Sequence, residues 1–248
     1  MGLLDSIKQA VSGKRFEDIG NIEPNCPNCG KALESKPSRK KKCPECGKFM
    51  FVRTRPSDNK KVLVTEAQAE VIEEQWSIVN GTYDSYLKDK NAFEDEKASQ
   101  AKRFGCAPSE NDVKWALLNR GLTEHALKGN WGHYRNTKLQ MANILRKEKK
   151  LKNALYFYLD VFYLDINGAN NIGGITNPEL LKKCPAFNAQ YAMVIPGNIE
   201  QISRIAKQMN ISKVEVENLF KEMVKQQYSF IQLPISPEKA WKTIETKL

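Results

Sequence analysis

The pattern of apolar positions along the chain changes at Thr65. Before it, two short apolar runs, "KFMFVRTR" (48–55) and "KVLVT" (61–65), flank the polar sequence "PSDNK". Runs of this length around Pro, Asp and Asn predict two strands joined by a turn. After it, Thr65 and Gln68 have the form of a capping box, which predicts a helix through "EAQAEVIEEQWSIV" that ends or bends at Asn80-Gly81. We therefore expect strands before Thr65 and helices after it.

The next two segments also carry helical signals. The charged stretch "YLKDKNAFEDEKASQAKRFG" predicts a solvent-facing helix, which we interpret as a connector. Ser109, with Asp112 three residues later, predicts the start of the following helix.

A pair of helices is predicted between residues 136 and 167, with the basic joint Lys149–Lys152 between them. Alanines in both helices let them approach closely, and the second helix contains the long apolar run "ALYFYLDVFYLDI". We expect this second helix to be buried on more than one side. The residues expected to face each other are Met141, Ala142, Leu145, Ala154, Tyr158 and Val161.

Another predicted helix pair, "IEQISRIAKQMNISKVEVENLFKEM", resembles a DNA-binding helix-turn-helix. Asn210 stands where that motif needs a left-handed residue, which asparagine tolerates. The second helix, however, carries Glu215, Glu217 and Glu222, which would repel phosphates in a groove. We expect plain packing of two helices. The predicted core residues are Ile205, Ala206, Met209, Ile211, Val216 and Leu219.

Four of the six cysteines indicate a metal site in the segment before Thr65. They lie in two copies of one sequence frame, Cys-Pro-x-Cys-Gly, which read "CPNCG" and "CPECG". Proline and glycine favour a tight turn that lets two thiolates hold one ion. Two such turns complete a closed site with four sulfur ligands, for which one structural zinc ion is the default. An iron site, a redox pair or disulfides are the alternatives. The predicted ligands are Cys26, Cys29, Cys43 and Cys46, whereas Cys106 and Cys184 are expected to be small buried residues.

The cysteine spacing suits a small β zinc ribbon, followed by a mostly α-helical domain. We expect residues 1–64 to hold an N-terminal helix and the ribbon, 65–106 a helical connector, and 107–248 the α-helical domain. The first segment is too small for a proper core, so metal binding must supply its folding free energy. At the N-terminus, the apolar stripe Leu3, Leu4, Ile7 and Val11 predicts a helix, docked on the protein or on a membrane surface.

Positive charge gathers around the cysteines. The net charge is +10, and the segment from Lys31 to Lys61 holds eleven basic residues against three acidic ones. A concentrated excess near the aromatic residues Phe49 and Phe51 favours nucleic-acid binding without sequence-specific readout. A protein partner or a solvated basic loop are the alternatives. The predicted nucleic-acid contacts are Arg39, Lys40, Lys41, Lys42, Arg53 and Arg55.

The other function classes have weaker support. The 248-residue chain is 41% hydrophobic and 27% charged, which is typical of globular proteins, and no apolar run approaches the roughly 20 residues of a membrane span. Asp5 and Lys8 interrupt the N-terminal apolar stretch, so we expect a cytoplasmic protein without a membrane partner. His125 and His133 lack a carboxylate or nucleophile at a pairing distance in sequence. We therefore expect no enzyme and no small-molecule substrate, with a hydrolase based on these histidines as a distant candidate.

Two segments resemble known families. Residues 26–55 are similar to the zinc-ribbon superfamily, and residues 136–167 resemble one tetratricopeptide unit. The whole, with "KFMFVRTRPSD", "WGHYRNTKLQMANIL" and "ALYFYLDVFYLDINGANN", resembles uncharacterised proteins encoded by bacterial phages and prophages. That resemblance implies an accessory protein acting on host or viral machinery, but no activity.

We expect a non-enzymatic adaptor whose ribbon binds nucleic acid and whose helical body binds a protein partner. The alternative is a phage accessory protein, an inhibitor or assembly component, that acts only by protein–protein interaction, with the ribbon as a structural cap.

Overall fold

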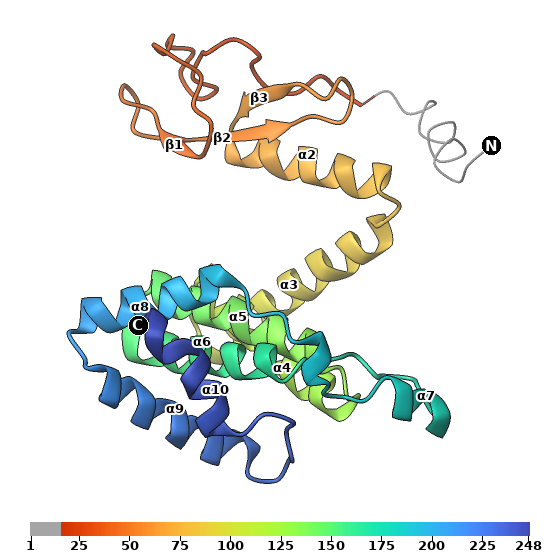
Figure 1. The fold of residues 1–248 in the computed structure, drawn as a ribbon. Coiled ribbons are helices and arrows are strands. Elements are labelled where there is room, and N and C mark those ends of the chain that lie inside the picture. Colours follow the sequence, from red (N-terminus) through yellow and green to blue (C-terminus); the bar gives the residue numbers. More distant parts are fainter. Residues whose placement is uncertain (1–15) are drawn as a thin grey trace. The chain divides into compact units, whose positions relative to one another are not determined.

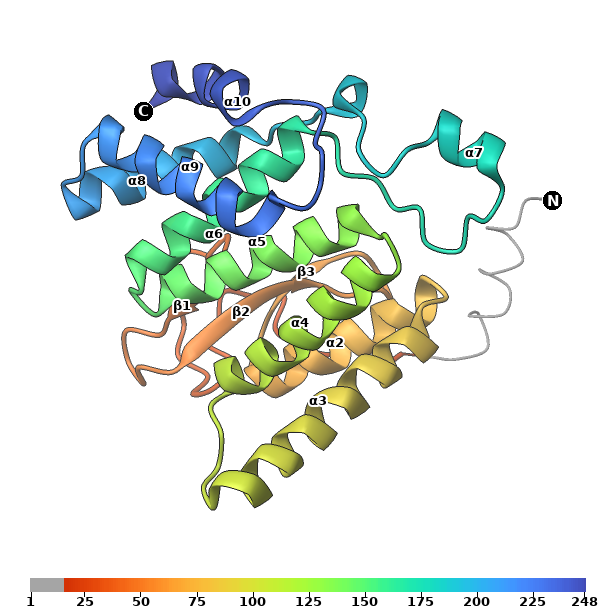
Figure 2. The same cartoon turned by 90° about the horizontal axis from the view of Figure 1, so that it is seen from below.

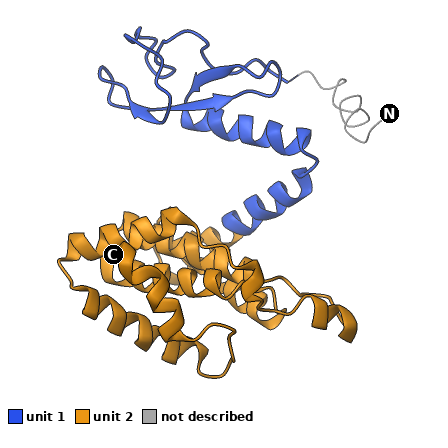
Figure 3. Cartoon of the chain, viewed as in Figure 1, with its two compact units in different colours: residues 1–94 blue, residues 95–248 orange. Residues whose placement is uncertain are grey.

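The computed structural model describes residues 16–248, and the chain divides into two compact units, Met1–Glu94 and Asp95–Leu248 (Figure 3). The predicted N-terminal helix, with Leu3, Leu4, Ile7 and Val11, lies outside the described residues. The border between the units falls inside the segment predicted as a connector, and the proposed division at residues 64 and 106 stays a prediction.

The first unit contains a three-stranded antiparallel sheet with strand order β1-β2-β3. The strands are β1 (Lys41–Lys42), β2 (Phe49–Thr54) and β3 (Lys61–Val64). Phe51 pairs with Val64 and Thr54 with Lys61, so the predicted hairpin is confirmed. Its turn places Asn59 at a φ of 57°, a left-handed conformation that asparagine adopts more readily than most residues.

Helix α2 (Glu66–Val79) packs on this sheet (Figure 1). Thr65 and Gln68 form the predicted capping box, and the indole N–H of Trp76 donates to the carbonyl of Thr54 at 2.6 Å. The shared apolar core is small, because few side chains line this face of the sheet. Its buried members are Phe51, Val62, Val64, Ala69 and Ile72.

Two helices follow in the chain. The helix α3 (Tyr83–Phe104) buries none of its residues, as the charged composition of this segment predicted. The helix α4 (Glu110–Leu127) begins with a capping box between Ser109 and Asp112, which confirms the predicted start.

The core of the second unit lies around α6 (Leu151–Ile166), which packs against α5 (Trp131–Lys147) (Figures 1 and 2). Three later helices also pack against α6, namely α8 (Pro196–Met209), α9 (Lys213–Tyr228) and α10 (Pro237–Ile244). The apolar run in α6 is buried almost throughout, as predicted. All six residues predicted to face each other in the α5–α6 pair are buried. The assignment of this pair to the tetratricopeptide class stays a prediction.

The rest of the second unit consists of short and medium helices. They are α7 (Pro178–Lys183), the 3₁₀ helix η1 (Ala189–Tyr191), α8 (Pro196–Met209), α9 (Lys213–Tyr228), α10 (Pro237–Ile244) and the 3₁₀ helix η2 (Glu245–Lys247). Between α8 and α9, Asn210 adopts a φ of 53° and a ψ of 40°, so the predicted left-handed turn is confirmed. Ile205, Ala206 and Val216 join the core of this unit.

Two buried ion pairs join α5 to α6. The guanidinium of Arg135 donates two hydrogen bonds to the carboxylate of Asp165, and Lys138 Nζ lies 2.9 Å from Asp160 Oδ2. The hydroxyl of Tyr228 also donates to Asp160. We did not predict these contacts, although charged residues inside an apolar helix were a visible signal.

Two further predictions concern the two remaining cysteines and membrane-spanning helices. Cys106 and Cys184 are exposed, so the prediction that they are buried was wrong. Both lie next to helix ends, Cys106 after α3 and Cys184 as the residue that ends α7. Among residues 16–248, no helix is long and apolar enough to cross a membrane.

Candidate metal centre

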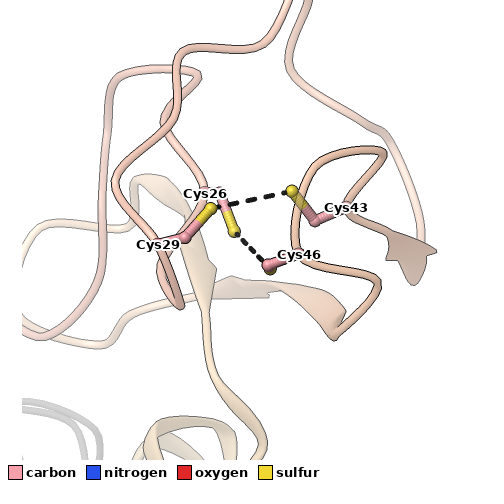
Figure 4. A group of neighbouring side chains, drawn as sticks. All are labelled: Cys26, Cys29, Cys43 and Cys46. Carbon is pink, nitrogen blue, oxygen red and sulfur yellow. Dashed lines mark hydrogen bonds between the residues drawn. The ribbon is translucent and has the colours of Figure 1, made fainter.

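The four predicted cysteine ligands come together in the first unit (Figure 4). Their Sγ atoms all lie within 4.8 Å of one another. Cys26 and Cys29 come from one loop, and Cys43 and Cys46 from the loop between β1 and β2. Residues far apart in the chain therefore supply one set of sulfur donors, which can hold a metal ion.

The two loops have the same backbone pattern, because they share the same sequence frame. In the first, the N–H of Gly30 donates to the carbonyl of Cys26 and the N–H of Cys26 to that of Lys31. In the second, Gly47 and Cys43 make the equivalent bonds, the latter to Lys48. Gly30 and Gly47 have φ values of 74° and 69°, which glycine adopts without strain. The predicted role of the closing glycines is thus confirmed.

Two hydrogen bonds from Asn28 support the first cysteine loop, one within the loop and one to the sheet. The N–H of Asn28 donates to Cys26 Sγ at 3.4 Å, the kind of donor that supports a metal-bound thiolate. The side-chain amide of Asn28 donates to the carbonyl of Phe49 in β2 at 3.0 Å. Cys26, Cys43 and Met50 form a small buried cluster between the loops and the sheet. The first cysteine loop is thus in contact with β2.

Distances between the sulfurs show that the four cysteines are not joined by disulfides in this structure. Cys26 Sγ lies 3.9 Å from Cys46 Sγ, and Cys29 Sγ lies 3.9 Å from Cys43 Sγ. A disulfide bond would place two sulfurs about 2.05 Å apart. The close pairs also join the two different loops, as ligands around one shared ion do (Figure 4).

The four thiols influence each other's pKa. The backbone N–H of Lys31 lowers the pKa of Cys29, but partial burial and the neighbouring sulfurs outweigh it and raise that pKa to about 12. The pKa of Cys43 is lowered to about 7, first of all because the backbone N–H of Cys46 donates to it. Four neighbouring sulfurs resist carrying four negative charges without a cation between them. This chemistry fits a divalent metal ion.

A row of cations lies on and just before the strand that leads into the second loop. Arg39, Lys40, Lys41 and Lys42 are exposed, and among residues 16–248 none of them has a carboxylate at ion-pair distance. Lys40 Nζ lies 4.4 Å from the ring centroid of Phe49, and Lys42 Nζ lies 5.1 Å from it. Phe49 is 45% exposed. Two amines and an accessible ring thus share one face of the sheet.

The two predicted arginine contacts differ from these lysines. Arg53 pairs with Glu73 of α2 at 2.9 Å. Arg55 is only 5% exposed, and its guanidinium makes two hydrogen bonds to the carboxylate of Asp58. That hydrogen-bonded pair holds the pKa of the Asp58 carboxyl well below its usual range. Both arginines are thus engaged within the first unit, so among the six predicted contacts the accessible cations are those of residues 39–42.

The two histidines lie together in the second unit. The ring centroids of His125 and His133 are 5.3 Å apart. Burial, followed by the charge of His133, lowers the pKa of His125. The backbone N–H of His133 donates to the side chain of Asn171. The contact alone assigns no chemistry to this pair, and the expectation of a non-enzymatic protein stays a prediction.

In the comparisons with known proteins, no family model, no curated protein and no solved structure matches the chain. The resemblances to zinc ribbons, to a tetratricopeptide unit and to phage-encoded proteins therefore stay predictions. The physical account of the site rests on the geometry of this chain alone.

Proposed function

We propose that this protein is a zinc-ribbon adaptor without enzymatic activity, which binds nucleic acid through its basic sheet face and a protein partner through its helical body. The observation that carries the nucleic-acid half is the set of exposed cations at residues 39–42 beside the accessible ring of Phe49. The segment that carries them leads directly into Cys43. Metal binding and nucleic-acid binding are therefore coupled in this proposal.

Zinc is the metal of the proposal. Zinc bound by four thiolates is tetrahedral with Zn–S distances of about 2.3 Å, which places the sulfurs about 3.8 Å apart. The two close sulfur pairs, at 3.9 Å, match that separation. A closed site of this type has no open position for a substrate, so the ion is structural. The bound ion leaves the site with a net charge of about −2, and the surrounding segment remains basic.

Single-stranded nucleic acid is the form that this face supports best. Lys40 and Lys42 are positioned to neutralise phosphates, and the ring of Phe49 offers a surface on which a base can stack. The described helices of this unit, α2 and the first part of α3, carry acidic residues. Recognition of a base sequence in the major groove is therefore no part of the proposal.

The protein-partner half rests on the helical body, whose α5–α6 pair we propose to be of the tetratricopeptide kind. Helix pairs of that kind stack with further helices and present binding surfaces. The packing of α8 and α9 on α6 supplies such flanking helices.

One observation favours the alternative in which the protein acts only on other proteins. The amines of Lys40 and Lys42 lie over the ring of Phe49, so the chain's own cations already cover part of that ring. In this alternative, the contact of the two amines with the Phe49 ring stabilises β1 at the edge of the sheet. The ribbon is then a structural cap. In this second candidate function, the protein is an inhibitor or an assembly component.

Elemental analysis of the purified protein tests the metal. We expect about one zinc ion per chain, because four cysteines share one ion. The absence of metal, or mass-spectrometric detection of two disulfides, contradicts the proposal.

Fluorescence anisotropy with labelled single-stranded DNA and RNA tests the binding face. Changing Arg39, Lys40, Lys41 and Lys42 together to glutamine should weaken binding and reduce the slope against log salt by about 0.7 for each phosphate that the variant no longer neutralises. A matched control removes the same charge from the second unit, by changing Lys182, Lys183, Lys239 and Lys242 to glutamine.

Phe49→Ala tests the stacking surface, and the quadruple variants separate the two candidate functions. Loss of a stacking ring should cost about 1–3 kcal/mol of binding free energy. If both quadruple variants bind nucleic acid like the parent protein, with the same salt slope, the nucleic-acid half is wrong and the protein-only alternative remains.

A further inference from the structure

A groove of about 650 Å³ runs along one face of α8 in the second unit. The helix turns its apolar residues Ile202, Ile205 and Ala206 toward the core. The face next to them is turned outward and lines the groove, together with one residue before α8 and one from η2. The lining residues are Val194, Pro196, Ile199, Glu200, Ser203, Arg204, Lys207 and Lys247.

The groove carries an excess of positive charge. Arg204, Lys207 and Lys247 are exposed, and within the described part of the chain none of them has a carboxylate at ion-pair distance. Glu200 is the one acidic residue among the lining residues of this groove. Cations that have no ion-pair partner around a groove favour an acidic ligand.

The floor of the same groove is apolar. Val194, Pro196 and Ile199 lie at the end of the groove where α8 begins. Next to them in the chain, Met193 is 75% exposed and Ile195 is 41% exposed. An apolar anchor side chain fits this end, and acidic groups fit the cations further along α8.

We propose that this groove binds an acidic amphipathic peptide segment of a protein partner, with an apolar side chain on the Val194–Ile199 floor and carboxylates at Arg204, Lys207 and Lys247. This inference specifies the protein-partner half of the proposed function and rests on it. A nucleic acid fits less well, because phosphates gain nothing from an apolar floor.

A defined probe tests the groove. A fluorescein-labelled peptide with glutamate and leucine at helical spacing is titrated into the full-length, zinc-loaded protein, and anisotropy gives the dissociation constant. We expect saturable binding that weakens with salt. Two control peptides carry glutamine in place of glutamate, or serine in place of leucine, and both should bind more weakly because each lacks one half of the recognition.

Variants of the protein locate the binding. Arg204→Glu with Lys207→Glu should weaken binding about tenfold or more, because like charges then face each other. The matched control, Lys182→Glu with Lys183→Glu, reverses the same charge on α7, which lies at the far end of this unit from α8 (Figures 1 and 2), and should leave the affinity unchanged. Ser203→Trp fills the groove without a change of charge and should also weaken binding. Circular dichroism confirms that each variant is folded.

Several outcomes overturn the inference. They are absence of binding, equal affinity of the parent and the Arg204/Lys207 variant, or equal binding of the glutamine peptide. Displacement of the peptide by a single-stranded oligonucleotide from the variant with glutamine at Arg39, Lys40, Lys41 and Lys42 would make the groove a nucleic-acid site. If the peptide fails but salt-dependent nucleic-acid binding by residues 39–42 persists, only this inference is wrong. If both fail, the adaptor proposal fails as well.

Discussion

The two units of this protein are stabilised in different ways. The described part of the first unit has small apolar clusters, one between the sheet and α2 and one around Cys26, Cys43 and Met50. The second unit has one large cluster that connects α5, α6, α8, α9 and α10. Burial of apolar area contributes roughly 25 cal/mol per Å², so the larger core supplies much more free energy.

The two units also differ in their buried charged groups. In the second unit, Lys138, Asp160 and Tyr228 form a polar contact inside a core that is stable enough to hold it. In the first, Arg55 pairs with Asp58, and four cysteines lie close enough together to hold a metal ion. We therefore propose that packing organises the second unit and coordination the first. A change that removes either cause should therefore affect one unit and spare the other.

The largest effect is expected from Cys43→Ser. Structural zinc contributes roughly 10–16 kcal/mol of apparent binding free energy in small zinc domains, and serine is a poor ligand for it. We expect loss of zinc and rapid proteolysis within residues 16–64, while the second unit resists the protease. Limited proteolysis with mass spectrometry measures this. Cys106→Ser, at an exposed cysteine outside the cluster, is the control and should change neither zinc content nor cleavage.

Lys138→Met should destabilise the second unit by about 3–5 kcal/mol, because it leaves the buried carboxylate of Asp160 without its cation. Urea unfolding followed by tryptophan fluorescence measures the change. The triple variant Lys138→Met, Asp160→Leu and Tyr228→Phe removes the charges and their partner together and should cost less than Lys138→Met alone. Equal or greater loss in the triple variant would mean that the ion pair is not what Lys138→Met disrupts.

A smaller effect is expected at Asn210, between α8 and α9. Its left-handed backbone costs an ordinary L-residue about 1–2 kcal/mol, so Asn210→Ala should lower the free energy of unfolding by about 1 kcal/mol. Asn210→Gly should be neutral or slightly stabilising because glycine carries no Cβ. Thermal unfolding of both variants compares them, and an equal loss in the two would contradict the role given to the backbone conformation.

The smallest effect at neutral pH belongs to Tyr163, whose hydroxyl donates to the carbonyl of Ile235 at 2.9 Å. Burial raises the pKa of Tyr163 to about 12, although a hydrogen bond with Asn167 opposes the shift. In the unfolded chain a tyrosine pKa is about 10. The folded state therefore holds this proton more tightly, and its contribution to stability is complete below about pH 10 and lost as the pH rises toward about 12.

Tyr163→Phe tests that contribution. The variant should lose less stability than the parent protein when the pH is raised from 8 to above 10, as measured by urea midpoints at each pH. A parallel loss in the two proteins would show that other groups, such as the buried Tyr228, determine the alkaline limit.

Local spacing explains what the sequence predicted. The cysteine frames, the capping boxes at Thr65 and Ser109, and the left-handed Asn210 all depend on residues within a few positions of each other. A backbone turn or a helix start needs only these neighbours. The turn within each cysteine loop was predictable for the same reason, because the two loops share the frame Cys-Pro-x-Cys-Gly.

Contacts between distant segments explain what was missed. The pairing of Lys138 with Asp160 and Tyr228 depends on which helices meet, and apolar periodicity does not show this. Cys106 and Cys184 were expected to be buried from residue type alone, which ignores their place at helix ends. For Arg55 a local signal was present, because Asp58 follows it across a predicted turn.

Hydrogen exchange of the full chain, with and without a zinc chelator, tests most directly whether coordination organises the first unit and packing the second. We predict that β2 and β3 lose protection when the metal is removed, whereas α6 keeps the protection that it has in the metal-loaded protein. Equal protection of β2 and β3 in the two states would contradict the account.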